Sequence, residues 1–326
     1  MLLLTKAIFA IMIGFLSSAL LGLILIPLLK KLRLGQKISI FVGETHRKKE
    51  GTPTMGGLIF ILPTVFATIG LVLMGKIPYS SSLGIVLLVF IGYACIGFLD
   101  DFLSIRKGNN EGLTTYQKLF MQVLIAIGFF YIYMRSGGQT AWVVGTLGID
   151  LELGWLYGLA ILFVLVGASN AVNLTDGIDG LAGGLSAVAF IAFALISLSV
   201  GFEEIGIFSL VLVGSLIGYL IYNTYPAKVF MGDTGSLALG AVMGAIAIIT
   251  HRELTLLVVA GIFVIETLSV ILQTFWVQVF HKKLFLMTPL HHHFEKLGWQ
   301  EQDIVKLFLV GGLILAMAGI IFGVWV

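Results

Sequence analysis

Long apolar runs recur along the whole chain and are separated by short polar connections. Ten runs are long enough, or nearly so, to cross about 30 Å of hydrocarbon. This pattern predicts an all-α, polytopic integral membrane protein with about ten transmembrane helices in a single transmembrane domain, residues 1–326. The runs cover residues 7–29, 55–75, 81–99, 118–134, 155–172, 181–200, 205–223, 236–250, 255–280 and 305–325.

The segments around these runs add three expectations. Residues 136–154 alternate weakly between apolar and polar side chains, which predicts a short β-hairpin. The first run is too long for a signal-peptide core and has no small-residue cleavage site, so we expect it to be retained as a span. Cys95, the single cysteine, lies in an apolar run, and we interpret it as a small buried hydrophobe.

Composition agrees with the membrane prediction. Hydrophobic residues make up 59% of the chain and charged residues only 11%, whereas soluble domains carry about 25% charged residues. A soluble enzyme is therefore excluded, and the lipid bilayer is the expected environment. The formal net charge of +2 gives no reason to expect a nucleic-acid partner.

The distribution of Lys and Arg predicts the orientation in the membrane. If the loops are numbered alternately, one set holds fifteen basic residues and the other holds four, which accounts for all 19. Because basic residues concentrate on the cytoplasmic side, the first set is expected to be cytoplasmic and both termini extracytoplasmic. The smaller set is Lys6, Lys76, Arg135 and Arg252.

Acidic side chains gather at the span ends that this orientation makes cytoplasmic. Asp100 and Asp101 directly follow the third run, and Asp233 precedes the eighth. Asn170, Asn173, Asp176 and Asp179 recur every three positions, a spacing that places them along one face of a helix end. Acids at a span end are costly unless they meet water, a cation or a partner. Solvated helix ends and simple helix caps are the alternative interpretation.

The chemistry of these residues favours a hard cation and a phosphorylated substrate. Carboxylate oxygens without a cage of Cys and His favour Mg²⁺ or Mn²⁺ over zinc. Glycines beside Asp233 allow close approach to a ligand, and a helix start suits phosphate oxygens. Three consecutive histidines, His291, His292 and His293, fan out on a helix. A phosphate-binding or structural role is favoured for them over zinc, with a polar surface loop as the alternative. Glu266, inside the ninth run, is expected to face the bundle interior or a cavity.

Five motifs together carry a family resemblance. The chain resembles the phospho-N-acetylmuramoyl-pentapeptide transferases, a branch of the polyprenyl-phosphate N-acetylhexosamine-1-phosphate transferases. The acidic motifs mark the superfamily, and the triple-His segment with Gly298-Trp299 favours the branch. The motifs are Gly51-Thr-Pro-Thr-Met-Gly-Gly57, Asp100-Asp101, residues 170–181, Phe230-Met-Gly-Asp-Thr-Gly-Ser236 and Pro289-Leu-His-His-His-Phe-Glu295.

The resemblance implies a reaction and its setting. Such an enzyme transfers phospho-MurNAc-pentapeptide from UDP-MurNAc-pentapeptide to undecaprenyl phosphate, giving lipid I and UMP, in the first membrane step of peptidoglycan synthesis. The resemblance also implies Mg²⁺, a homodimer, and a multi-pass protein of the bacterial plasma membrane whose site faces the cytoplasm. We favour direct attack by the lipid phosphate over a phospho-enzyme, because a phosphate oxygen is already a competent nucleophile near neutral pH.

Residue roles follow by the same resemblance. Asp233 matches the Mg²⁺ ligand, Asp100 the group that orients or deprotonates the lipid phosphate, and Asp101 its support, so these three are the expected catalytic residues. Gln273 matches a contact on the nucleoside side, and Phe230 a ring that stacks on uracil. The remaining expected substrate-binding residues are Lys49, Thr54, Asn173, Asp176, Asp179, His291, His292 and His293.

The chain differs from the family pattern at one position, and two alternative functions are considered. The family often has a Lys shortly after the Asp pair, whereas this chain has Ser104 there, followed by Arg106 and Lys107 as possible replacements. The first alternative is a relative that uses UDP-GlcNAc or another UDP-N-acetylhexosamine, against which the triple-His segment argues. The second is a secondary transporter, whose acids usually lie near mid-membrane between repeats.

Overall fold

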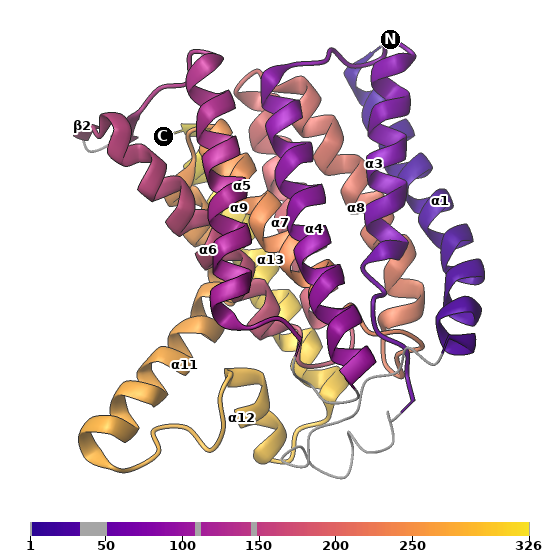
Figure 1. Ribbon diagram of the computed structural model, residues 1–326, viewed down its shortest axis with the longest axis vertical. Coiled ribbons are helices and arrows are strands. Elements are labelled where there is room, and N and C mark those ends of the chain that lie inside the picture. The colour runs from indigo at the N-terminus through magenta and orange to yellow at the C-terminus, as the bar shows by residue number, and fades with distance from the viewer. Residues whose placement is uncertain (1, 33–50, 108–111, 145–148, 326) are drawn as a thin grey trace.

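The computed structural model describes residues 2–32, 51–107, 112–144 and 149–325. Helices account for most of this part of the chain, which confirms the predicted all-α class (Figure 1). The helices are α1 Leu3–Lys31, α3 Leu58–Leu73, α4 Ser81–Lys107, α5 Thr115–Arg135, α6 Tyr157–Thr175, α7 Leu181–Ser199, α8 Glu203–Asn223, α9 Gly232–Ile249, α10 Glu253–Val259, α11 Gly261–Phe280, α12 Leu290–Lys296 and α13 Glu301–Trp325, with a 3₁₀ turn at Gly154–Leu156.

The apolar runs become helices of membrane-spanning length. Within the described residues, nine helices are long and apolar enough to cross a membrane, and α3 is a shorter apolar helix of 16 residues. The multi-pass membrane prediction is therefore confirmed. The run at 255–280 is not one helix, because the chain breaks at Ala260 between α10 and α11. A short helix, α12, also forms over the triple-His segment, where the sequence pattern predicted none.

The hairpin predicted between residues 136 and 154 is confirmed. Strands β1 (Ala141–Val144) and β2 (Ile149–Glu152) pair antiparallel, with Ala141 opposite Glu152 and Val144 opposite Ile149. The hairpin lies between α5 and α6 in the sequence and precedes the 3₁₀ turn that starts α6. The exposed, charged Glu152 of β2 suits a position outside the hydrocarbon.

The centre of the bundle is formed by α7, α8 and α9, which are the most buried helices. Around them, α1 packs on α8, α4 and α6 pack on α9, and α13 packs on α7. Small residues permit the closest of these approaches, as is common where no hydrophobic driving force brings membrane helices together. A Cβ on Gly97 of α4 would overlap the carbonyl of Asp233 at the start of α9. This contact fixes the spacing of the two helices that carry the predicted catalytic acids.

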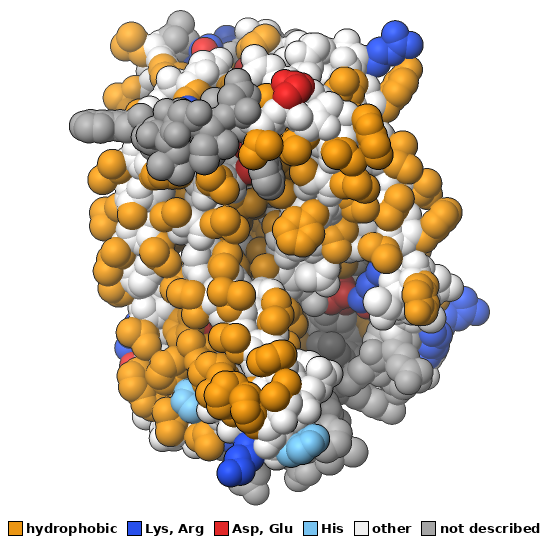
Figure 2. Space-filling model, turned by 90° about the vertical axis from the view of Figure 1, so that its left-hand side faces the viewer, with side chains coloured by type: hydrophobic (Ala, Val, Ile, Leu, Met, Phe, Trp, Pro, Cys, Tyr) orange, Lys and Arg blue, Asp and Glu red, His pale blue; other side chains and the backbone are white. Residues whose placement is uncertain are grey.

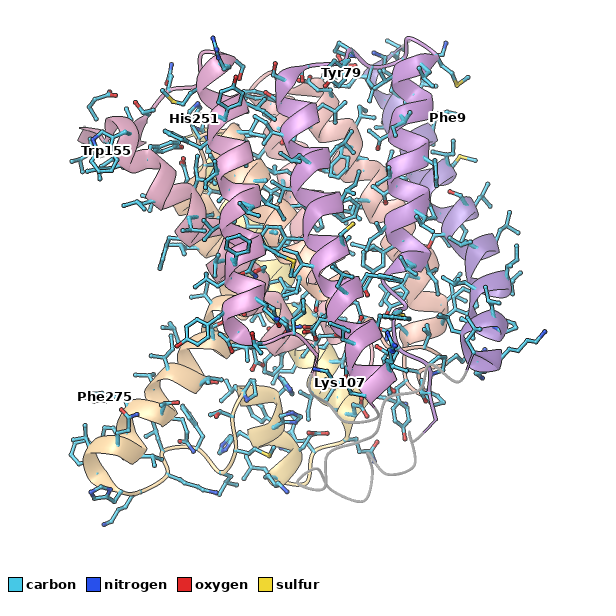
Figure 3. The ribbon with its side chains drawn as sticks, in the orientation of Figure 1. Phe9, Tyr79, Lys107, Trp155, His251 and Phe275 are labelled. Atoms are coloured by element: carbon cyan, nitrogen blue, oxygen red, sulfur yellow. The ribbon has the colours of Figure 1, made fainter. Side chains whose placement is uncertain are left out.

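The molecule has two distinct ends. Both termini lie at one end of the bundle (Figure 1). Tyr79 and His251 also lie towards that end, whereas Lys107 lies at the opposite one (Figure 3). Helix α11 leans away from the bundle at the Lys107 end, with α12 beside it (Figure 1). In Figure 2, hydrophobic side chains cover the middle of the face, and basic, acidic and histidine side chains appear in its lower half.

Three local predictions need correction. Asp100 and Asp101 do not end a span, because α4 continues to Lys107. Helix α6 ends at Thr175, so Asp176 and Asp179 lie in the following turn and do not share a helix face with Asn173. Cys95 is exposed on α4 and not buried. A side chain that faces outward from a span meets lipid, which is as apolar as the protein core. Hydrophobicity therefore does not distinguish an interior position of Cys95 from an outward-facing one.

Candidate active site

Two helices bring Asp100 and Asp233 together, and a third supplies a cation between them. Asp100 is buried on α4, and Asp233 lies in the first turn of α9. The Nζ atom of Lys118, from α5, lies 2.9 Å from Asp100 Oδ1 and 2.7 Å from Asp233 Oδ2. Asp100 Oδ1 also accepts a hydrogen bond of 2.7 Å from the backbone N–H of Leu113. The result is a carboxylate–ammonium–carboxylate bridge across three helices.

An amide completes the surroundings of Asp233. Asn173, on the last turn of α6, donates from Nδ2 to Asp233 Oδ1 at 2.8 Å. The same Nδ2 lies 2.8 Å from the hydroxyl of Ser236, which donates to the carbonyl of Gly232. Asn173 is therefore brought to the site as predicted, whereas Asn170 is exposed and donates to the carbonyl of Val166 within its own helix.

Asp101 holds the start of α9. Its carboxylate accepts hydrogen bonds from the backbone N–H groups of Asp233 and Thr234, at 3.2 and 3.0 Å, and from the Thr234 hydroxyl at 2.6 Å. The first N–H groups of a helix lack partners within it, and a carboxylate satisfies them while meeting the positive end of the helix dipole. Asp101 therefore fixes the helix turn that carries Asp233, and its predicted support of Asp100 in handling the lipid phosphate stays a prediction.

A short extended segment packs against the Asp233 motif. Phe230 N–H donates to the carbonyl of Pro53, and Gly56 N–H donates to the carbonyl of Phe230, both at 2.8 Å. This pairing places Thr54 beside Gly232, which has a φ of +72°. A Cβ on Gly232 would lie 2.6 Å from Thr54 Oγ1 and would overlap the Asp101 carboxylate. The buried Thr54 hydroxyl has no hydrogen-bond partner among the described residues.

The turn after α6 concentrates negative charge. Burial, together with the carboxylates of Asp233, Asp101 and Asp179, raises the pKa of Asp176 to about 8. Asp179 is tied into the protein, because its Oδ2 accepts from Ala227 N–H at 2.9 Å and its own N–H donates to Glu301 Oε1 at 2.6 Å. The Asp176 carboxyl is thus the less compensated of the two acids in this turn.

Two predicted nucleoside contacts differ in their placement. Phe230 is half-buried directly before the Met231–Gly232 start of α9, so it lies beside the acidic cluster. Gln273 of α11 donates from Nε2 to the Phe285 carbonyl at 3.0 Å, and its Oε1 accepts from the N–H groups of Leu284 and Phe285, both at 2.9 Å. The amide of Gln273 therefore fastens the loop between α11 and α12, and its contact with a nucleoside stays a prediction.

The three consecutive histidines have three different surroundings. His291 is fully buried beside Glu266, with its Nδ1 at 3.3 Å from Glu266 Oε2. His292 Nδ1 pairs with Glu295 Oε2 at 2.5 Å. His293 Nδ1 accepts from the backbone N–H of Leu286 at 3.2 Å. Burial lowers the pKa of His291, and the neighbouring Glu266 partly opposes that shift. The rings fan out as expected from consecutive positions on a helix.

Some functional positions were missed, and one cannot be described. The sequence indicates only a cytoplasmic charge at Lys118, and the structure places its ammonium group between Asp100 and Asp233. Lys107 instead donates to the Gly112 carbonyl at 3.0 Å. Asn223 was also missed; its side chain accepts from Gly180 N–H and donates to the Val229 carbonyl. Lys49 lies outside the described residues.

The donor set suits a hard divalent cation. Asp233 and Asp176 contribute carboxylate oxygens, whereas both oxygens of Asp101 already accept hydrogen bonds from the start of α9. Burial, and after it the neighbouring carboxylates, raise the pKa of Asp176, and a bound cation would offset the repulsion among these carboxylates. Over the described ranges, no group of three or more His, Cys, Asp or Glu side chains forms a ready-made metal cage. Mg²⁺ does not need such a cage, because it is usually bound by one or two carboxylates together with waters and substrate phosphates.

Comparison with known proteins places this fold and site in a class. The family model for glycosyl transferase family 4 matches residues 83–251, which include both Asp100–Asp101 and the Asp233 motif. The chain is therefore a membrane-embedded member of that transferase class.

More specific matches narrow the class to one family. The phospho-N-acetylmuramoyl-pentapeptide-transferase signature 1 matches residues 49–61. Proteins named phospho-N-acetylmuramoyl-pentapeptide-transferase are similar over 97% of this chain and 98% of their own length, with 46% identity in Bacillus subtilis (strain 168) and 44% in Geobacillus thermodenitrificans (strain NG80-2). The chain belongs to the phospho-N-acetylmuramoyl-pentapeptide transferase family.

Proposed function

We propose that this protein transfers phospho-MurNAc-pentapeptide from its UDP carrier to undecaprenyl phosphate, releasing UMP and forming lipid I. Family membership supports the reaction and argues against a secondary transporter. The observation that carries the residue assignment is the Lys118 bridge between Asp100 and Asp233, with Asn173 on the other side of Asp233. A fixed ammonium group among carboxylates, at the edge of an apolar bundle, suits phosphoryl transfer between a soluble nucleotide and a lipid.

The reaction exchanges one phosphoanhydride bond for another. An oxygen of the lipid phosphate attacks the phosphorus that carries the sugar, and the bond from that phosphorus to the bridging oxygen of UMP breaks. A phosphate monoester has a second pKa near 6, so the attacking oxygen is already largely ionised at neutral pH. A covalent phospho-enzyme is then unnecessary, and Asp100 acts by orienting the lipid phosphate or accepting its remaining proton.

Lys118 stabilises the negative charge that develops during the transfer. Phosphoryl transfer spreads negative charge over the equatorial oxygens, and preorganised cations lower the barrier. Lys118 is held by two carboxylates before substrate arrives, so its position costs little to establish during the reaction. Asp101 and Asn173 keep the Asp233 carboxylate in place through the contacts described above. Both interactions restrict the movement of Asp233, and neither involves the reacting phosphorus.

Mg²⁺ is the proposed cofactor, with Asp233 as its principal ligand and Asp176 as a neighbouring carboxylate. When bound, it would supply neutralisation of the diphosphate oxygens and of charge developing on the leaving UMP. The partly exposed Asp233 and the cluster of carboxylates around Asp176 support this assignment.

The site is proposed to face the cytoplasm. Lys107 and Lys118 belong to the larger, predicted cytoplasmic set of basic residues, and Lys107 lies at the end of the bundle opposite the termini (Figure 3). This orientation would admit the nucleotide from the cytoplasm and the lipid phosphate from the adjoining leaflet. The homodimer stays a prediction from the family resemblance.

The test is UMP release by the purified protein in detergent with undecaprenyl phosphate and Mg²⁺. UDP-MurNAc-pentapeptide and UDP-GlcNAc would be supplied in parallel. We expect release only with the muramoyl donor, and only with both lipid and metal. Release with UDP-GlcNAc alone would keep the transferase chemistry and change the substrate, whereas release without lipid phosphate would refute direct transfer to the lipid.

A further inference from the structure

A carboxylate lies fully buried on a helix that is otherwise largely exposed. Glu266 is 0% exposed, and the other buried residues of α11 are Gly261, Phe263 and Ser269. Burying an ionised carboxylate without partners is costly, so its partners indicate why it is there. Its Oε1 accepts from the backbone N–H of His291 at 3.2 Å, and its Oε2 lies 3.3 Å from the Nδ1 atom of the same residue. Both contacts join α11 to α12.

The far side of the His291 ring faces the acidic turn after α6. A Cβ placed on Gly177 would overlap His291 Nε2, so the ring edge lies directly against the backbone next to Asp176. The ring is completely buried, and neither ring nitrogen makes a well-directed hydrogen bond to any described residue. The ring of His292 packs beside it, with centroids 4.2 Å apart. His291 is thus enclosed, with Glu266 on one side and the Asp176–Gly177 backbone on the other.

We infer that Glu266 is a positioning residue for the transfer reaction, acting through His291 on the Asp176–Gly177 turn. This inference rests on the proposed function, because Asp176 belongs to the transfer site proposed there. The ionised Glu266 carboxylate lies 3.3 Å from Nδ1 and can only accept a hydrogen bond, so its negative charge favours the tautomer with the proton on Nδ1 and leaves the lone pair of Nε2 towards the turn. Glu266 touches neither substrate nor metal in this scheme.

The amide of Gln would not reproduce this constraint. It can donate to Nδ1 as well as accept from it, so Glu266→Gln permits the other tautomer, with Nε2–H pressed against Gly177. Asp keeps an acceptor-only carboxylate on a shorter side chain. If Glu266 acted only by filling space, the isosteric Gln variant would be the better substitute. If it acts by setting the His291 tautomer, the Asp variant would be the more active one.

The experiment uses the full-length protein and measures kcat and KM for UMP release, with thermal unfolding as a stability measurement. The variants are Glu266→Gln, Glu266→Asp, His291→Asn, and His291→Asn combined with Glu266→Gln. The matched control is Glu204→Gln, a buried acid of α8 that accepts a hydrogen bond from Ser80 at 2.7 Å away from the site. We expect Glu266→Gln to lower kcat/KM roughly 10–100-fold, by analogy with carboxylates that orient metal-bound histidines.

Two comparisons decide the inference. Glu266→Asp should retain more activity than Glu266→Gln, and the double variant should be no less active than His291→Asn alone. A more active Gln variant, effects that multiply in the double variant, or a loss no greater than that of Glu204→Gln would each overturn it. If the wild-type protein releases no UMP, the proposed function fails separately. The same variants are then compared by their affinity for UDP, for which the same order is expected.

Discussion

Replacing Lys118 with Met tests the electrostatic argument most directly. The substitution keeps the aliphatic bulk and removes the ammonium group that lies 2.9 Å from Asp100 and 2.7 Å from Asp233. Removing one preorganised donor aimed at developing charge costs about 10²–10³-fold in kcat. We expect a loss of at least 100-fold in kcat for UMP release.

The same substitution should have a smaller effect on stability. The Lys118 side chain is 28% exposed and those of Asp100 and Asp233 are 12% and 22% exposed, so water can replace part of the lost interaction. Breaking a fully buried pair costs about 3–5 kcal/mol, and solvent screening lowers the expected loss here to about 1–2 kcal/mol. Thermal unfolding in detergent measures this loss.

A neighbouring lysine provides the control. Lys107 is exposed and, among the described residues, donates to the Gly112 carbonyl and contacts neither acid of the bridge, so Lys107→Met should leave kcat within about twofold of the wild type. If Lys118→Met retains a third or more of wild-type kcat while remaining folded, the bridge is structural and the electrostatic role is refuted. Equal losses in the two variants would indicate a general effect of surface charge on lipid-substrate binding.

Three further predictions concern the same cluster. Asp233→Asn should reduce UMP release more than about 10³-fold at every Mg²⁺ concentration, because an amide is a poor substitute for a metal-binding carboxylate; near-normal turnover at limiting Mg²⁺ would remove Asp233 from the site. Gly232→Ala should destabilise the protein by more than the roughly 1–3 kcal/mol of left-handed backbone strain, since its Cβ also meets Thr54 and Asp101. Gly298→Ala, with a φ of +90° and open space around its Cβ, isolates the strain, and equal unfolding midpoints would contradict the packing argument. The pKa of Asp176 is raised from 3.8 to about 8 in the folded protein. Between about pH 4 and pH 8 the folded state therefore keeps a proton that the unfolded state has lost. As the pH rises through this range, Asp176 should make the metal-free protein less stable. Asp176→Asn should flatten that part of the unfolding curve, and an unchanged slope would count against it.

Much of the fold follows from hydropathy, because a membrane span requires about 20 apolar residues whatever their order. The wrong predictions share one cause. Hydropathy reports how long and how apolar a segment is, but not where the helix breaks or which way a side chain faces. The break at Ala260 lies inside a continuous apolar run, so nothing in the composition marked the change from α10 to α11. Cys95 was assigned to the interior for the same reason, although its side faces outward.

In the candidate site, the sequence identifies residues that lie in motifs but not residues whose role depends on tertiary packing. Motifs identified Asp100, Asp101, Asn173 and Asp233 because polar residues next to long apolar runs are conspicuous in so apolar a chain. Lys118 was not assigned to the site, because its role depends on how α5 packs beside α4 and not on its sequence neighbours. Asn223 and Glu301 were missed because they bind backbone groups of the Asp179–Gly180 turn, contacts that leave no periodic signal.

The way Asp101 holds the start of α9 limits how the site can adapt to its substrates. Helices α4 and α9 are joined at that point by three hydrogen bonds and by the close approach at Gly97, so neither can slide along the other without breaking several contacts at once. Lys118 bridges the two helices from α5, so its ammonium group is held in the same frame as the acids. The acids and the lysine therefore form one stationary site, and an incoming phosphate has to adapt to the positions that they already hold.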